Sequence, residues 1–146
     1  MATLIDGNII DDKVIDGKAF SKELRAKLTH QVTDIKKHHK ITPGLAVILV
    51  GEDPASEVYV NNKEKSAHSC GFHSVAYKLE ETISEAALLT LIEELNEDQT
   101  IHGILVQLPL PPHISKGAVL RHIDPLKDVD GFHPINIGKL AIGKPA

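Results

Sequence analysis

The most constraining feature of this sequence is an unbroken apolar segment, GLAVILVG at residues 44–51, directly followed by signals for the start of a helix. Apolar residues without alternation predict a strand buried on both faces, which is typical of a parallel sheet. Asp53 can cap the next helix, and Pro54 suits its first position because the N–H that proline lacks has no helical partner there. A strand and helix joined this closely favour an α/β fold, whose ligands bind at the carboxyl ends of the strands.

The predicted helix carries three polar side chains on one face. Ser56, Tyr59 and Lys63 lie at positions i, i+3 and i+7, which places them within roughly 60° of the helix circumference. A hydroxyl, a phenol ring and an amine therefore project together. Structural interpretations compete at each position: a first-turn serine bonds backbone N–H groups, a helical tyrosine packs against the core, and a lysine extends into solvent.

Helices and strands alternate along the rest of the chain. Asp16 is suited to cap a first helix ending near residues 38–40, whose apolar residues recur every three or four positions: Phe20, Leu24, Leu28, Val32 and Ile35. Further strands are predicted at residues 73–79 and 103–106, and further helices after Ser84 and at residues 115–122 and 136–140.

This order predicts the α/β class, as a three-layer domain with a mainly parallel sheet flanked by helices. We expect residues 1–13 to form an N-terminal extension and residues 14–146 to form one domain.

Composition narrows the classes of function. The formal net charge of -4 argues against a nucleic-acid partner or an anionic membrane surface. A single cysteine, Cys70, excludes an internal disulfide and a multi-cysteine zinc site, and we expect a buried, unreactive thiol there. The nine histidines show no metal-ligand spacing, so no metal is expected. Without a signal peptide or a membrane-spanning segment, the expected location is the cytoplasm.

Three segments together resemble one family: VGEDPASEVYVNNK at residues 50–63, GILVQLPLP at 103–111 and KDVDGFHPIN at 127–136. They resemble, in the same order, the bifunctional methylenetetrahydrofolate dehydrogenase/methenyltetrahydrofolate cyclohydrolase of one-carbon metabolism and purine biosynthesis. The resemblance implies an N-terminal domain that binds tetrahydrofolate as substrate and a C-terminal Rossmann domain that binds NADP. The Rossmann domain is absent from these 146 residues. We therefore expect a truncated or isolated folate domain with cyclohydrolase activity, whose dehydrogenase activity is doubtful. The alternatives to an active enzyme are a module that only binds folate and a fragment without turnover.

The resemblance also implies roles for individual residues. Lys63 matches the general acid/base of the cyclohydrolase step, and Gln107 matches the residue that holds the lysine amine. Ser56 is a further hydrogen-bond partner for Lys63, with the capping interpretation weighed equally. These three are the expected catalytic residues.

The expected substrate-binding residues are Tyr59, Asp130, Leu108 and Pro109. Tyr59 matches the tyrosine that stacks on the folate ring system, and Asp130 matches the carboxylate that accepts from the amino-pyrimidine edge. Spacing alone does not decide which of Asp130 and Asp128 binds the substrate. If Asp130 does, Asp128 would be a turn or capping residue. Leu108, Pro109 and Pro111 are expected to wall the pocket.

The expected partner is a small-molecule folate, with no nucleic acid, membrane or metal. Family members dimerise mainly through the domain that this chain lacks, so we expect a monomer.

Overall fold

A three-stranded parallel sheet lies at the centre of the protein. The computed structural model describes residues 3–5, 8–10 and 16–145. The strands are β3 (Gly44–Val50), β4 (His73–Leu79) and β5 (Gly103–Val106), in the order β4-β3-β5. The central strand β3 pairs in parallel with both neighbours, so that Val47 lies opposite Ala76 on one side and Leu105 on the other. The predicted α/β class and parallel sheet are confirmed.

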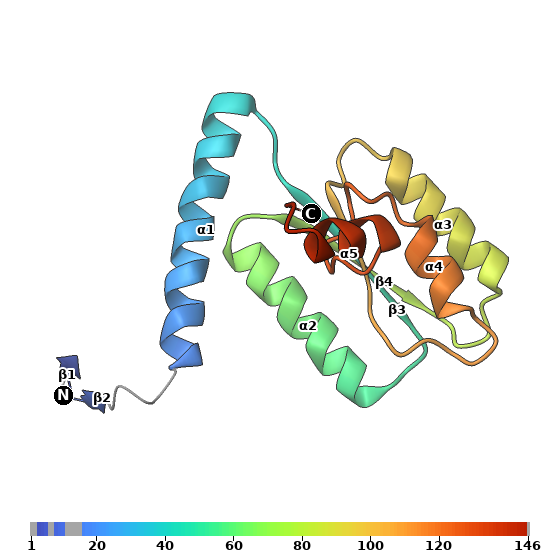
Figure 1. Ribbon diagram of the computed structural model, residues 1–146, viewed down its shortest axis with the longest axis horizontal. Coiled ribbons are helices and arrows are strands. Elements are labelled where there is room, and N and C mark those ends of the chain that lie inside the picture. The colour runs from blue at the N-terminus through green and yellow to red at the C-terminus, as the bar shows by residue number, and fades with distance from the viewer. Residues whose placement is uncertain (1–2, 6–7, 11–15, 146) are drawn as a thin grey trace.

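Helices cover both faces of this sheet (Figure 1). Helix α2 (Pro54–Ser69) lies on one face, and α3 (Glu85–Glu97) and α4 (Lys116–His122) lie on the other. Alternate residues of β3 supply the two cores: Ile48 packs with α3 and α4, whereas Leu49 packs with Val60 of α2. Because side chains on a strand point alternately to opposite faces, a strand covered on both sides must be apolar at every position.

The predicted caps explain where the helices begin. The Asp53 carboxylate accepts from Ser56 N at the start of α2, and the Ser84 hydroxyl accepts from Ala87 N at the start of α3. Helix α5 (Pro134–Ala141) starts two residues earlier than the spacing predicted, because His133 caps it and Pro134 occupies its first turn. No helix in the described ranges is both long and apolar enough to cross a membrane.

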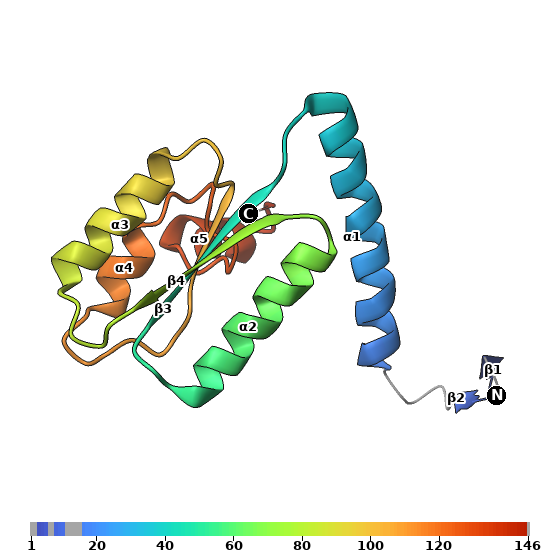
Figure 2. The same cartoon turned by 180° about the vertical axis from the view of Figure 1, so that it is seen from behind.

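Helix α1 (Gly17–His39) forms as predicted from its Asp16 cap but stands beside the domain (Figure 2). Of its apolar stripe, Val32 is buried, whereas Phe20 is 67% exposed and Leu24 is 45% exposed. The attachment is local: Cys70 Sγ lies 3.7 Å from Arg25 O, and Cys70 is buried as expected. Amphipathic spacing therefore predicted the helix, but the described residues leave much of its apolar face uncovered.

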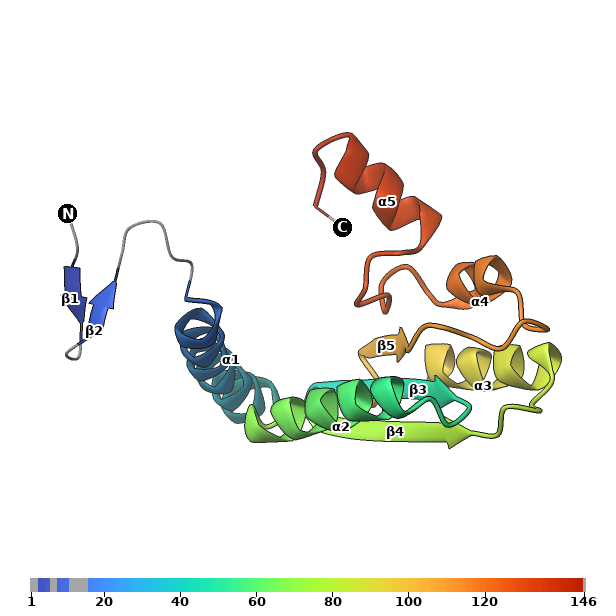
Figure 3. The same ribbon diagram turned by 90° about the horizontal axis from the view of Figure 1, so that it is seen from below.

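A short strand pair near the N-terminus and helix α5 near the C-terminus lie apart from the central sheet. In the expected extension, β1 (Thr3–Ile5) and β2 (Asn8–Ile10) pair antiparallel. The other residues of the extension, and the expected domain start at residue 14, lie outside the described residues. At the opposite end of the chain, α5 stands clear of the sheet (Figure 3).

A close backbone contact at the start of β3 requires glycine. A methyl group at Gly44 would overlap the carbonyl oxygen of Thr100. We expect Gly44→Ala to lower the free energy of unfolding by about 2–4 kcal/mol, because neighbouring backbone yields less readily than a flexible side chain. Urea denaturation followed by circular dichroism measures the change. Gly138→Ala in α5 is the matched control, since a methyl there meets nothing within 4 Å; stability equal to wild type in Gly44→Ala would contradict the contact.

Candidate active site

A lysine and a glutamine from different elements meet beside the carboxyl end of β5. Lys63 Nζ on α2 donates to Gln107 Oε1 at 2.9 Å. The other end of the amide is also fixed, because Gln107 Nε2 donates to Leu108 O at 2.8 Å. Gln107 N donates to Ile48 O at 2.8 Å, which ties the residue to β3. Since an amide carries its donor and acceptor on opposite sides, these contacts aim the acceptor oxygen at the lysine.

Asp130 lies within electrostatic range of this lysine. Loss of hydration raises the pKa of its carboxyl, the Lys63 ammonium lowers it in part, and the neighbouring Asp128 carboxylate raises it further. The net pKa of Asp130 lies above the ordinary aspartate value. Within the described part of the chain its carboxylate makes no hydrogen bond, so both oxygens can accept from a ligand.

The Asp128 carboxylate is occupied by hydrogen bonds within its own loop and from α5. Its Oδ2 accepts from His133 N at 2.8 Å and from Asn136 Nδ2 at 3.0 Å. Burial raises the pKa of Asp128, but hydrogen bonds from Asn136 and from the backbone of residues 131–133 outweigh burial and hold it below its ordinary value. The structure thus assigns Asp128 to the turn, as expected, and leaves Asp130 as the available carboxylate.

Tyr59 lies one helical turn before Lys63 on the same face of α2. The residue is 63% exposed, so the core-packing interpretation is wrong. Its ring is available as a flat apolar surface beside the Lys63 amine.

Ser56 belongs to the helix cap. Hydrogen bonds from its hydroxyl and its backbone N–H to the Asp53 carboxylate hold the pKa of Asp53 below the ordinary value. Ser56 is buried and, among the described residues, forms no hydrogen bond with Lys63. The structure therefore places Ser56 near the site without bringing its hydroxyl to the lysine.

A cavity of about 390 Å³ opens between the β3–α2 turn and the proline-rich segment after β5, and its lining includes neither Lys63 nor Gln107. Residues 50–53, Glu81 and residues 109–112 line it. Pro109 and Pro111 belong to this lining, and their place in the wall of the substrate site stays a prediction. Leu110 also lines the cavity, whereas Leu108 does not; the Leu108 carbonyl accepts from Gln107 Nε2, and the place of its side chain in the wall of the substrate site stays a prediction.

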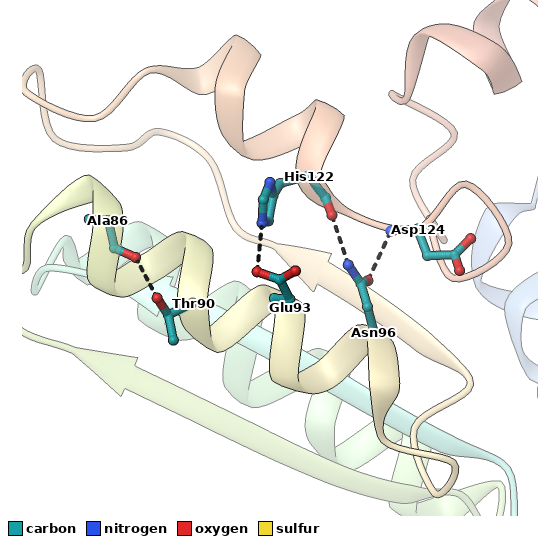
Figure 4. A network of polar contacts seen from close by, with 6 residues as sticks. All are labelled: Ala86, Thr90, Glu93, Asn96, His122 and Asp124. Carbon is teal, nitrogen blue, oxygen red and sulfur yellow. Dashed lines mark hydrogen bonds and ion pairs between the residues drawn. The ribbon is translucent and has the colours of Figure 1, made fainter.

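The loop that carries Asp130 starts from a fixed point (Figure 4). Asn96 of α3 donates through Nδ2 to His122 O at 2.8 Å and accepts through Oδ1 from Asp124 N at 2.9 Å. His122 Nε2 also lies 3.7 Å from a Glu93 carboxylate oxygen. These contacts attach the end of α4 and the beginning of the loop to α3.

Sequence reasoning gave no role to His133 or Asn136, which are buried polar residues. The His133 ring accepts from Ile135 N at 3.2 Å, and the Asn136 amide contacts Asp128. A polar residue before proline was a detectable cap signal at His133. No local pattern indicated that Asn136 would face inward.

The arrangement suits proton transfer on a flat ligand. An amine is held by an amide, an available carboxylate lies within its electrostatic range, and an exposed aromatic ring lies one turn away. An amine positioned this way can take up and return protons. A carboxylate suits a ligand edge with two parallel N–H donors.

Comparison with known proteins identifies the family. Residues 15–130 match the catalytic domain of tetrahydrofolate dehydrogenase/cyclohydrolase. The bifunctional protein FolD of Rhodospirillum rubrum is 56% identical over 131 residues, which cover 90% of this chain and 44% of that protein. For FolD of Streptococcus agalactiae serotype Ia the identity is 55%, with 91% of this chain and 47% of that protein covered.

Solved structures agree with these sequences. The bifunctional FolD methylenetetrahydrofolate dehydrogenase/cyclohydrolase of Campylobacter jejuni superimposes with a TM-score of 0.86 at 50% identity, covering 88% of this chain and 45% of that one. The Trypanosoma brucei FolD, solved with NADP and an inhibitor, also gives 0.86, at 42% identity, covering 88% and 44%. The chain spans about half the length of the relatives it matches. With the family profile matched over most of its residues, the chain belongs to the tetrahydrofolate dehydrogenase/cyclohydrolase family.

Proposed function

We propose that this chain binds tetrahydrofolates and hydrolyses methenyltetrahydrofolate to formyltetrahydrofolate. The observation that carries the proposal is the 2.9 Å hydrogen bond from Lys63 Nζ to Gln107 Oε1 beside the carboxyl end of the sheet. Family membership supplies the class of ligand. Asp130 and the exposed ring of Tyr59 complete a group that can hold a flat heterocycle next to the amine.

In the proposed reaction, water adds to the cationic carbon that bridges two folate nitrogens. The water oxygen forms a bond to that carbon and loses a proton. The hydroxyl oxygen then gives up its proton and forms a second bond to the carbon while one carbon–nitrogen bond breaks. The electron pair of that bond returns to its nitrogen, which takes up a proton, and the carbon is left as a formyl group on the other nitrogen, with one proton released overall. Lys63 Nζ is the group that accepts and returns protons, and Gln107 keeps this nitrogen in place.

Asp130 and Tyr59 are proposed to bind the substrate. The Asp130 carboxylate would accept two parallel hydrogen bonds from the amino-pyrimidine edge, which fixes the ring in one orientation. Tyr59 would stack on the ring plane. Pro109 and Pro111, which follow Gln107 and line the cavity next to the β3–α2 turn, would give the substrate a rigid apolar border.

The stacking role predicts that Tyr59→Ala weakens binding of 5-formyltetrahydrofolate by roughly tenfold, equivalent to about 1.4 kcal/mol of lost aromatic contact. Tyr59→Phe is the matched control and should bind like wild type, because it keeps the ring and loses only the hydroxyl. Isothermal titration calorimetry measures both affinities. A side chain 63% exposed contributes little packing, so the unfolding midpoint should stay unchanged. Wild-type affinity in Tyr59→Ala would remove the stacking role.

The described residues do not fit NADP. A dinucleotide pyrophosphate binds at a glycine-rich turn that opens a helix. Here the corresponding turn between β3 and α2 carries Glu52 and Asp53, whose charges would repel phosphate. No hydride step is therefore assigned to these residues, and we propose that NADP in the longer relatives is held by other parts of the protein.

We further propose the setting of the reaction. The chain would act as a monomer in the cytoplasm, in one-carbon metabolism that supplies purine biosynthesis. Its partner would be a small-molecule folate, without nucleic acid or membrane. Lys63 supplies the proton chemistry, so the proposal requires no metal.

A folate-binding module without turnover is the second candidate. The exposure of Tyr59 and Asp130 favours it, because a site open to water on one side excludes solvent poorly. The absorbance decay of methenyltetrahydrofolate separates the two candidates. Hydrolysis faster than the uncatalysed background supports the enzyme. Hydrolysis at the background rate together with saturable binding of 5-formyltetrahydrofolate supports the binding module. Hydrolysis at the background rate without binding contradicts both the enzyme and the module.

A further inference from the structure

We propose that Asp128 and Asn136 are positioning residues, which hold the loop of residues 128–133 and with it the backbone that carries Asp130. This inference rests on the proposed function, because the value of the position lies in folate binding. Neither Asp128 nor Asn136 is proposed to touch the ligand. Asp128 and Asn136 together form the brace of this loop.

One side of the loop is attached to the sheet. Asp128 forms a parallel bridge with Ile104 of β5, and Ile104 N donates to Lys127 O at 2.7 Å. The Lys127 ammonium is bonded to the backbone at the end of α3, through Leu95 O at 2.9 Å and Asp98 O at 2.8 Å. The start of the loop is thus a short additional strand with an anchored side chain.

The close fit of this strand depends on Gly103. A methyl group at Gly103 would lie 2.5 Å from Cγ1 of Val129, the residue immediately before Asp130. Glycine at this position lets the loop approach β5 directly. The sheet therefore fixes residues 127–129 up to the neighbour of the proposed ligand residue.

The other side of the loop is closed by the brace. Asn136 Nδ2 donates to Pro125 O at 2.8 Å and to Asp128 Oδ2 at 3.0 Å, and Asn136 is only 2% exposed. The same Asp128 oxygen accepts from His133 N at 2.8 Å. Residues 125, 128, 133 and 136 are therefore joined through two side chains, and Asp130 and Gly131 lie within the closed loop.

Gly131 permits the tight turn inside this closure. Its φ of +68° lies in the left-handed region, where a side chain is disfavoured. A turn held by the brace orders the backbone around Asp130 when the protein folds. The entropy of ordering it is then not lost when a ligand binds.

The brace also separates the roles of two neighbouring carboxylates. Asp128 receives N–H donors from Asn136 and from residues 131–133. Asp130 has no hydrogen-bond donor among the described residues. One carboxylate therefore maintains the loop, and the other remains available to a ligand.

Amide hydrogen exchange of the ligand-free chain tests the brace without reference to folate. Asp128→Asn keeps the size of the side chain but removes its charge and leaves one acceptor oxygen for the donors of Asn136 and residues 131–133, so that its NH₂ group faces some of them. We expect exchange in residues 130–133 to accelerate by about tenfold or more, with β3 and α2 unchanged. Asp124→Asn is the matched control, because it removes one charge from the same loop and its amide oxygen can still accept from Leu126 N. Unchanged exchange in Asp128→Asn would overturn the brace.

A double-mutant cycle tests whether the brace acts through Asp130. We expect Asp128→Asn to weaken binding of 5-formyltetrahydrofolate by about tenfold in the wild-type background, and to add nothing in the Asp130→Ala background. A general loss of stability would instead weaken both backgrounds equally, and that additive result would overturn the positioning role. Wild-type affinity in Asp128→Asn would overturn it as well.

Failure of the proposed function gives a different pattern. If the wild-type chain binds no folate, the function proposed above is wrong. Accelerated exchange in Asp128→Asn would then still support the brace as the device that holds Asp130, and unchanged exchange would contradict both.

Discussion

Lys63→Met is expected to reduce hydrolysis of methenyltetrahydrofolate by roughly 100- to 10,000-fold, the range found when a positioned acid/base group is lost. Methionine keeps the length and apolar stem of the side chain but carries neither the amine proton nor the contact with Gln107 Oε1. The fold should persist, because Lys63 lies at the margin of the core and its stem is largely preserved. The absorbance decay of the substrate at saturating concentration measures the change.

A control variant and a binding measurement show whether a loss of activity in Lys63→Met reflects lost chemistry. Lys65→Met is the matched control, since Lys65 lies on the same helix, is exposed and has no contact with Gln107 among the described hydrogen bonds. It should hydrolyse like wild type. Lys63→Met should also bind 5-formyltetrahydrofolate within a few-fold of wild type, which separates lost chemistry from lost binding. Wild-type turnover in Lys63→Met would remove the lysine from the mechanism.

Asp130→Ala is expected to weaken folate binding by roughly 10- to 100-fold, the usual cost of losing hydrogen bonds to a charged group. Calorimetric titration with 5-formyltetrahydrofolate gives the ratio of affinities. Asp124→Asn removes a carboxylate from the segment before Asp130, keeps an acceptor for Leu126 N and should bind like wild type. Equal affinities in the two variants would contradict the assignment of Asp130 to the ligand.

The raised pKa of Asp130 adds a pH dependence with a defined sign. The ligand-binding form is the carboxylate, and lost hydration makes it take up a proton at higher pH than an ordinary aspartate. Binding should therefore be intact near neutrality and should weaken on acidification, beginning above the ordinary aspartate range. Asp130→Ala should lack this component of the pH profile. A profile identical in wild type and Asp130→Ala would contradict the role.

Local signals in the sequence were sufficient for the elements that frame the site. The apolar run of β3 requires cover on both faces, and Asp53 and Ser84 form their caps through contacts within three residues. Such features depend on near neighbours or on burial alone, so periodicity and capping rules predict them. The contact between Lys63 and Gln107 spans 44 positions, and it was expected only because of the family resemblance.

The differences arise where spacing alone does not tell which contacts a residue makes in the folded chain. The apolar face of α1 has the spacing of a buried stripe, yet Phe20 and Leu24 remain exposed because the described elements do not lie over them. Ser56 turned to its cap instead of Lys63, since Asp53 is three residues away and already fixed by the helix start. The backbone carbonyl of Leu108 accepts a hydrogen bond from Gln107 Nε2, and a pattern of side chains cannot predict such a backbone contact.

Asn136 illustrates a third kind of difference. The two acceptors of its Nδ2 group, Pro125 O and Asp128 Oδ2, come from the loop that precedes the helix, so its orientation depends on the path of that loop. Buried amides become visible only when the tertiary structure provides their partners. The brace that we propose for Asp130 was for this reason not deducible from spacing.

The most direct test of the account is to map the folate site on the wild-type chain by ¹H–¹⁵N correlation spectra during titration with 5-formyltetrahydrofolate. We expect saturable shifts centred on the amides of Tyr59, Lys63, Gln107 and Asp130, with smaller shifts at residues 109–112, which follow Gln107 in the chain. Shifts centred instead on the exposed face of α1, or no saturable shifts at all, would contradict the placement of the site between α2, β5 and the loop of residues 128–133.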